Sequence, residues 1–342
     1  MQSSLFPDST DMPDTPGGAV RPARHAATLK ELAAKLPAGL HLGTSSWHYP
    51  GWATLVWDKV YSEAQLSRDG LPAYATHPLF NTVGVDRGFY TPLTREQYAE
   101  HAAQVPDDFR FVIKAPAQVT DAQVRGAGGK GQETNPLFLD PATALETFVT
   151  PALAGMGPKL GALVFQISPL PATWRGEIAG LIQALHRLLR ALPDLTASAP
   201  DAVVAVEVRD PEWLTPDFTA ALKDTGATYC LGLHPKMPPI DEQLPILRAL
   251  WPGPLVCRWN VNPIHGAYGY EQARDKYAPF DKMVDPDLAT RSALAKVIAG
   301  TVRGGQNAFV TLSNKAEGSA PLSVTALAEA IVARTPEPLA RS

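Results

Sequence analysis

Cysteine is scarce in this sequence, which holds only Cys230 and Cys257 among 342 residues. Neither belongs to a CxxC pair or to a zinc-type spacing, and each lies in an apolar run typical of a strand. We therefore expect two buried, reduced thiols, as in a cytoplasmic protein, with neither a disulfide framework nor a cysteine metal site.

Long apolar runs are also missing. No window reaches the roughly 18 continuous apolar residues of a membrane span, so we expect no contact with a membrane. The opening stretch MQSSLFPDSTDMPDTPGG has prolines and acids but no basic region followed by an apolar one, so it does not resemble a secretory signal. We expect it to form part of a disordered leader.

Charge is low, at 19% of residues against about 25% in typical soluble domains, whereas apolar residues reach 45%. That apolar content is enough for a substantial core. The formal net charge is -4, so the chain lacks the excess of Lys and Arg that holds a nucleic-acid backbone. We expect no extended nucleic-acid surface, although a small basic pocket remains compatible with this balance.

Short, nearly continuous apolar runs recur along the chain, as expected for parallel strands covered on both faces. There are eight, at 41–46, 80–86, 109–115, 161–167, 202–208, 228–233, 254–259 and 307–313. Helix-length patterns separate most of them, at 94–105, 141–153, 177–192, 215–226, 287–305 and 323–334, with a weaker, Gly- and Pro-interrupted one at 62–78.

The ends of two helices can be predicted from their terminal residues. Thr215 is a plausible N-cap followed by Pro216 at the first helical position, and Gly226 closes the same helix. Ser323 is the plausible N-cap of the last helix.

Eight strands alternating with helices predict an α/β fold of the TIM (β/α)8 barrel type, in a single domain with long loops after strands 3 and 7. A doubly wound open sheet is the alternative, but no GxGxxG follows the first strand. We expect a disordered leader over 1–38, the barrel over 39–336 and a C-terminal tail over 337–342. The long loops cover 123–136 and 259–286, where barrel enzymes place substrate contacts.

A barrel carries its site at the carboxyl ends of its strands, and polar residues follow each apolar run here. Side chains alternate along a strand, so Glu207 and Arg209 share a face with Ala205, and Arg258 shares one with Asn260. If those faces point inward, a carboxylate and several cations meet in the barrel mouth. The candidate ligand-binding residues are Ser45, Trp47, Asp86, Tyr90, Lys114, Gln166, Arg209, Arg258, Asn260 and Asn314.

Glu207 is the candidate acid or base, because confinement can shift the pKa of a carboxyl group. Burial would raise that pKa, whereas Arg209 and Lys114 would keep the group ionised, and the sequence leaves both outcomes open. The same residues could instead form a structural ion pair that closes the barrel top. No HxH, HExxH or GxSxG motif occurs, so we expect no metal site or serine nucleophile, and no cofactor is implied.

Six motifs, in this order, resemble the YecE-like family, also called the domain-of-unknown-function 72 family. They are GTSSWHYPGW, FNTVGVDRGFYTP, FRFVIKAPAQVTD, LGALVFQISPLP, VEVRDPEW and SNKAEGSAP, and the resemblance spans roughly residues 40–335. It implies a TIM barrel without an established reaction. It also makes Gly43 to Trp47 a recurring signature, in which Trp47 either stacks on a ligand or only roofs the barrel.

Departures from the family pattern imply a divergent member. Asp86 stands where the family usually has asparagine, and Gly84 where it has glutamate. Asp121 and Asp210 each stand where histidine is usual, and Asn260 stands in place of the histidine of an Arg-x-His-Gly motif.

Three functions are compatible with these residues. The first is an enzyme acting on a small polar or anionic compound, sugar-like or phosphorylated, with Glu207 as acid or base. In it, Lys114, Arg209 and Arg258 hold anionic groups, while Gln166 and Asn314 orient the ligand. The alternative is a non-catalytic binding or scaffold protein that kept the barrel. A metal-dependent hydrolase or nuclease-like barrel is the third.

Overall fold

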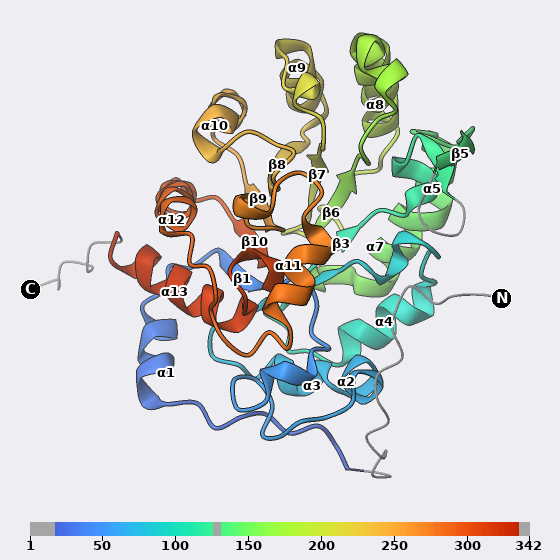
Figure 1. Ribbon diagram of the computed structural model, residues 1–342. Coiled ribbons are helices and arrows are strands. Elements are labelled where there is room, and N and C mark those ends of the chain that lie inside the picture. The colour runs from blue at the N-terminus through green and yellow to red at the C-terminus, as the bar shows by residue number, and fades with distance from the viewer. Residues whose placement is uncertain (1–17, 126–130, 335–342) are drawn as a thin grey trace, which may run out of the picture.

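The computed structural model describes residues 18–125 and 131–334. In it, eight parallel strands close into a barrel in the order β1-β10-β9-β8-β7-β6-β3-β2 (Figure 1). The closed sheet confirms the predicted barrel and replaces the open-sheet alternative. The barrel strands are β1 (Leu40–Thr44), β2 (Thr82–Val85), β3 (Arg110–Lys114), β6 (Leu160–Gln166), β7 (Val203–Glu207), β8 (Thr228–Leu233), β9 (Leu255–Trp259) and β10 (Ala308–Leu312).

Helices lie around the barrel (Figure 1), and apolar side chains of most of them form one core cluster with the outward side chains of the strands. They are α1 (Ala27–Ala34), α2 (Glu63–Asp69), α3 (Leu71–Tyr74), α4 (Arg95–Ala103), α5 (Ala117–Thr120), α6 (Pro141–Ala144), α7 (Thr150–Met156), α8 (Ile178–Arg190), α9 (Pro216–Thr225), α10 (Ile240–Ala249), α11 (Tyr270–Tyr277), α12 (Leu288–Arg303) and α13 (Ala320–Val332). No helix within the described ranges is long and apolar enough to cross a membrane.

The predicted ends of α9 are confirmed. The side chain of Thr215 accepts a hydrogen bond from the backbone N–H of Phe218 at 3.2 Å, and Gly226 adopts the left-handed conformation at φ 70°. Glycine reaches that conformation without strain, which is why it ends the helix.

The predicted N-cap of the last helix is wrong. Ser323 lies inside α13, which begins at Ala320 with Ser319 in the cap position. Pro321 sits in the first turn, where its missing N–H costs nothing, so the helix starts one turn earlier than its apolar pattern indicates. Helix α10 was not predicted, and it contains Pro245, a residue that usually ends helices.

The region expected to be a leader is partly structured. Residues 27–34 form α1, and Val20 and Ala23 are buried. Residues 1–17, and the expected tail at 337–342, lie outside the described residues.

Both long loops carry secondary structure of their own. The loop after β3 contains the antiparallel pair β4 (Gln123–Arg125) and β5 (Gly131–Thr134). The loop after β9 contains α11, which contacts the short 3-10 helix Asn314–Ala316 that follows β10. Helix α11 follows β9 and the 3-10 helix follows β10, so their contact lies beyond the carboxyl ends of these strands. Helix α11 therefore covers the carboxyl end of the barrel and stands in front of it in Figure 1.

The barrel interior is divided into an apolar part and a charged part. Its apolar cluster consists of Val112, Ala162, Val164, Ala205, Cys230, Val256 and Phe309. The inward-facing residues nearer the carboxyl ends of these strands are Lys114, Gln166, Glu207 and Arg258. These four residues form the charged layer, and the carboxyl end of the barrel where they lie is its mouth. Both cysteines are free and buried, as predicted.

Candidate functional site

Glu207 lies at the centre of the charged layer. It is the last residue of β7, and its side chain is 0% exposed. Arg209 Nη2 forms an ion pair with its Oε1 at 2.6 Å, and Arg258 Nη1 donates a hydrogen bond to its Oε2 at 2.7 Å. Asn260 adds a bond from Nδ2 to Oε1 at 3.2 Å. Both carboxylate oxygens are therefore held by charged donors.

The cations decide the ionisation of Glu207. Burial alone would raise its pKa, but the opposing charges of Arg209, Arg258 and Lys114 outweigh burial, and the pKa lies below its ordinary value. Glu207 is therefore ionised at neutral pH. A general acid needs a raised pKa, so this environment suits a structural anion better than a proton donor.

Arg258 links opposite sides of the barrel mouth. Its Nη1 bonds Glu207 on β7, while its Nη2 donates to Asp86 Oδ2, just after β2, at 2.6 Å. Gln166 Oε1 accepts from Arg258 at 3.3 Å and from Arg209 at 3.2 Å. The network therefore fixes both guanidinium groups in position.

Arg209 keeps one donor without a partner. Its side chain is buried, and Nη1 has no hydrogen-bond partner among the described residues. Burying an unpaired charged donor is costly, and native structures usually satisfy such groups with protein, water or ligand atoms. A water or a ligand oxygen would satisfy this donor.

Lys114 ends β3 and is half-buried in the same mouth. Its Nζ lies 3.5 Å from the centroid of the Phe89 ring, a cation–π contact. Burial lowers its pKa to about 8; Asp86 opposes the shift, whereas Arg258 and Arg209 add to it.

Residues after β10 complete the mouth. Lys315 is buried, with Nζ 4.3 Å from the centroid of the Tyr270 ring. Burial would lower its pKa, but Tyr49 and Tyr270 raise it overall. Asn314 accepts from Trp52 Nε1 at 3.1 Å and from the Ala320 N–H at 2.8 Å. Its oxygen therefore ties the first loop to α13.

The structure does not bring every candidate into this mouth. Trp47 is buried in the outer core, where it donates to the Leu66 carbonyl at 3.2 Å and packs against His101. It therefore packs between the barrel and α2 and does not line the charged mouth. Tyr90 is 81% exposed. Ser45 is half-buried directly after β1. The candidates that the structure does bring together in the mouth are Asp86, Lys114, Gln166, Glu207, Arg209, Arg258 and Asn260.

Some residues of the mouth were missing from the candidate set. Lys315 and Phe89 follow strand ends, so the rule that identified the other candidates would have found them. The hydroxyl of Thr311, near the carboxyl end of β10, is buried without a partner in the described part of the chain. Thr311 pairs with Arg258 in the sheet register, so strand alternation was the available signal.

Each of the three unusual aspartates has its own partner. Asp86 pairs with Arg258, Asp121 pairs with Arg125 at 2.5 Å, and Asp210 accepts from the Leu170 N–H at 2.8 Å. The substitutions therefore belong to local networks. Asp86 also reduces the positive charge of the mouth.

Over the described ranges, no group of three or more His, Cys, Asp or Glu side chains is arranged to hold a metal ion. The carboxylates of Asp86 and Glu207 both face Arg258, and that guanidinium occupies the space where a shared cation would bind.

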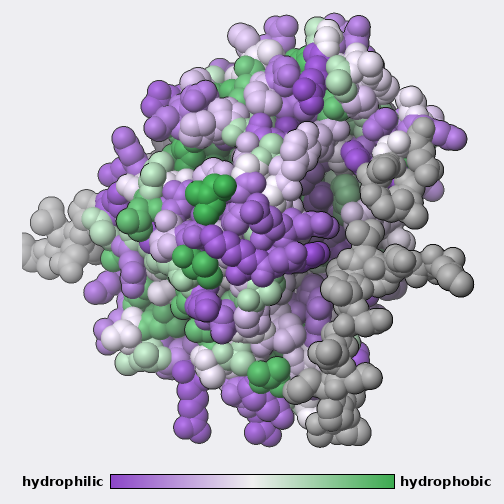
Figure 2. Space-filling model, viewed as in Figure 1, coloured by the Kyte–Doolittle hydropathy of each residue, from purple (hydrophilic) through white to green (hydrophobic). Residues whose placement is uncertain are grey.

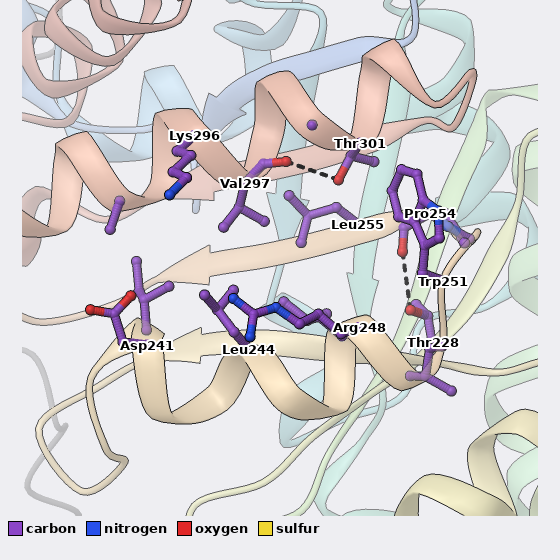
Figure 3. A pocket seen from close by; sticks show the side chains of 16 residues that line it. Thr228, Asp241, Leu244, Arg248, Trp251, Pro254, Leu255, Lys296, Val297 and Thr301 are labelled. Carbon is purple, nitrogen blue, oxygen red and sulfur yellow. Dashed lines mark hydrogen bonds between the residues drawn. The ribbon is translucent and has the colours of Figure 1, made fainter.

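Figure 2 shows the face on which α11 lies in Figure 1. The surface there is hollowed to the right of a group of hydrophilic residues at the centre of the view. Two other grooves lie away from the charged layer. One, of about 540 Å³, runs between α10 and α12 near the amino ends of β8 and β9, with Leu244, Trp251 and Val297 in its wall (Figure 3). The other, of about 450 Å³, lies between α1 and α13. Neither is lined by Glu207 or Arg209.

Comparisons with known proteins agree with the geometry of the fold. A family model described as "Protein of unknown function DUF72" matches residues 41–341. A DUF72 family protein from Enterococcus faecalis is 18% identical, with 85% of this chain and 95% of that chain covered and a TM-score of 0.56. A DUF72 family protein from Thermotoga maritima is 17% identical, with 85% and 98% covered and a TM-score of 0.55. No curated protein matches the sequence.

Proposed function

Since this chain belongs to the DUF72 family, whose name assigns no reaction, we propose from its own residues that the barrel mouth binds a small anionic ligand. A phosphorylated, sugar-like compound is the class that fits best. The unpartnered Nη1 of Arg209 carries this proposal, because a ligand oxygen would satisfy that buried donor. Phosphate and carboxylate groups match the planar fork of a guanidinium.

The charge of the mouth supports an anion. Lys114, Arg209, Arg258 and Lys315 contribute four cationic groups, against the two carboxylates of Glu207 and Asp86. The uncompensated charge lies in a partly desolvated site, where electrostatic attraction is stronger than in water. A neutral sugar would leave this charge unmatched.

Glu207 has a positioning role in this proposal. Its two oxygens hold Arg209 and Arg258 in position, and the unpartnered Nη1 of Arg209 is left for the ligand. Acid or base catalysis by Glu207 is the less favoured form of the proposal, because its lowered pKa makes it a weak base and its oxygens already accept charged donors. A binding protein without turnover uses the same mouth and is the second candidate, favoured by the neutralising contact of Asp86 with Arg258.

Titration calorimetry with inorganic phosphate and glucose 6-phosphate tests the proposal, with glucose as the neutral control. We expect binding of the two anions, no binding of glucose, and at least a tenfold loss of affinity in Arg209→Gln. Arg190→Gln is the matched control, because Arg190, at the end of α8, forms an exposed ion pair with Asp224 of α9. Equal affinity for phosphate in wild type and Arg209→Gln would refute the assignment.

A further inference from the structure

Lys114 differs from the other cations of the mouth in its contacts. The two arginines are fixed by carboxylates, whereas no carboxylate oxygen in residues 18–125 or 131–334 forms an ion pair with Lys114 Nζ. The ammonium instead faces the Phe89 ring at 3.5 Å. The face of a phenyl ring donates no hydrogen bond to nitrogen. Once Lys114 loses its proton, the lone pair of its neutral amine is therefore free to attack a substrate.

Its surroundings favour that loss. Burial is the largest cause, and the nearby charges of Arg258 and Arg209 add to it; Asp86 and Glu207 oppose the shift, and the pKa still falls to about 8. A desolvated lysine beside other cations is the usual setting for an amine nucleophile. The other cations of the mouth differ: guanidinium groups do not deprotonate in proteins, and the pKa of Lys315 is raised.

The sheet order places Lys114 within reach of a ligand held by Arg209. Lys114 ends β3 and Arg209 follows β7, with β6 between the two strands. Two inter-strand spacings amount to about 10 Å across the sheet, and the register places Arg209 four residues beyond Ala205, which is level with Lys114. The Arg209 side chain folds back towards Glu207 and Gln166, and its charge acts on Lys114. A ligand whose anionic group contacts Arg209 can therefore present an atom a few bonds away to Lys114.

We infer that Lys114 forms an imine with the carbonyl carbon of a small phosphorylated aldehyde or ketone, an inference that rests on the proposed anion site. The neutral amine attacks the carbonyl carbon, so that a C–N bond forms and the C=O π electrons move to oxygen; a proton then passes from the positively charged nitrogen to that oxygen, which restores the nitrogen lone pair. The resulting carbinolamine loses its hydroxyl as water when a second proton arrives from solvent, and the C=N bond forms. No oxidant or reductant takes part.

Reductive trapping tests this inference. The full-length protein is incubated with dihydroxyacetone phosphate and sodium cyanoborohydride, and adducts are located by peptide mass spectrometry. We expect a saturable adduct on Lys114, competed by inorganic phosphate, and none at that position in Lys114→Arg. Exposed Lys296 on α12 serves as the internal control for nonspecific labelling. Trapping should become faster as the pH approaches 8, roughly tenfold per unit below the pKa.

The outcomes separate this inference from the proposed function. Phosphate binding by calorimetry without a preferential adduct on Lys114 overturns the imine and leaves the anion site standing. An equally fast adduct with neutral dihydroxyacetone, uncompeted by phosphate, overturns the phosphorylated class of substrate. Labelling spread evenly over Lys114 and Lys296, with no phosphate binding, overturns both.

Discussion

Replacing Glu207 with glutamine tests how the charged layer is held together. Glutamine keeps the shape of the side chain but removes the negative charge that faces Arg209 and Arg258. The charge-assisted hydrogen bond from Arg258, a contribution of roughly 1.5–3 kcal/mol, is weakened to a neutral one, and the ion pair with Arg209 is lost. Removing one partner of a buried ion pair costs about 3–5 kcal/mol, because the remaining charge stays buried without compensation.

We expect Glu207→Gln to lower the free energy of unfolding by about 3–5 kcal/mol, which is a large share of the roughly 5–15 kcal/mol of a typical protein. Urea denaturation followed by circular dichroism measures this change, and the thermal midpoint should fall by an amount on the order of 10 °C. Glu212→Gln is the matched control, since Glu212 is exposed near the same end of the barrel. A loss under about 1 kcal/mol would refute our account of the layer.

The pH dependence gives the same variant a second readout. The pKa of Glu207 is lowered in the folded state from its ordinary value of 4.5. Its stabilisation is therefore fully present above pH 4.5 and is lost as the pH falls through the lower, folded-state pKa. The difference in stability between wild type and Glu207→Gln should shrink across that acidic range. A difference that stays constant down to the lowest pH at which both fold would contradict the assigned ionisation.

Three further predictions concern the mouth and its supports. The affinity for inorganic phosphate should fall as the pH rises through about 8, because Lys114 loses its charge there. Calorimetry on Lys114→Arg should show a smaller change of affinity with pH, and the same change as in wild type would count against Lys114 as a ligand contact. Gly51→Ala should lower the free energy of unfolding by about 1–3 kcal/mol, since the new Cβ would lie 1.7 Å from the Pro279 carbonyl oxygen. Gly176→Ala is the control, because its Cβ would meet nothing within 4 Å, and it should leave urea denaturation unchanged. Thr215→Ala should cost about 1 kcal/mol in the same assay through loss of the N-cap of α9, with Thr219→Ala as a non-cap comparison on that helix.

The sequence predicts the barrel because its strands are short, apolar and regularly separated. The alternation of Ala205, Glu207 and Arg209 along β7 was enough to place a carboxylate and a cation at the mouth. The ionisation of Glu207 could not be predicted, because it depends on how close the Arg209 side chain folds back, at 2.6 Å, and on the 2.7 Å contact with Arg258, which lies 51 residues away. The place of Trp47 was also open, since an indole can follow a strand end and still turn outward beneath α2.

The bridge from Asp86 through Arg258 to Glu207 also bears on how the barrel reaches its native state. Asp86 and Arg258 are 172 residues apart, and Glu207 and Arg258 are 51 apart. A partly assembled sheet that lacks β9 would bury the Glu207 carboxylate without its Arg258 partner. Long-range contacts of this kind form late and slow the folding reaction. The charged layer should therefore make the two halves of the chain fold as one cooperative unit. It should also make compact states in which the barrel is not yet closed less stable.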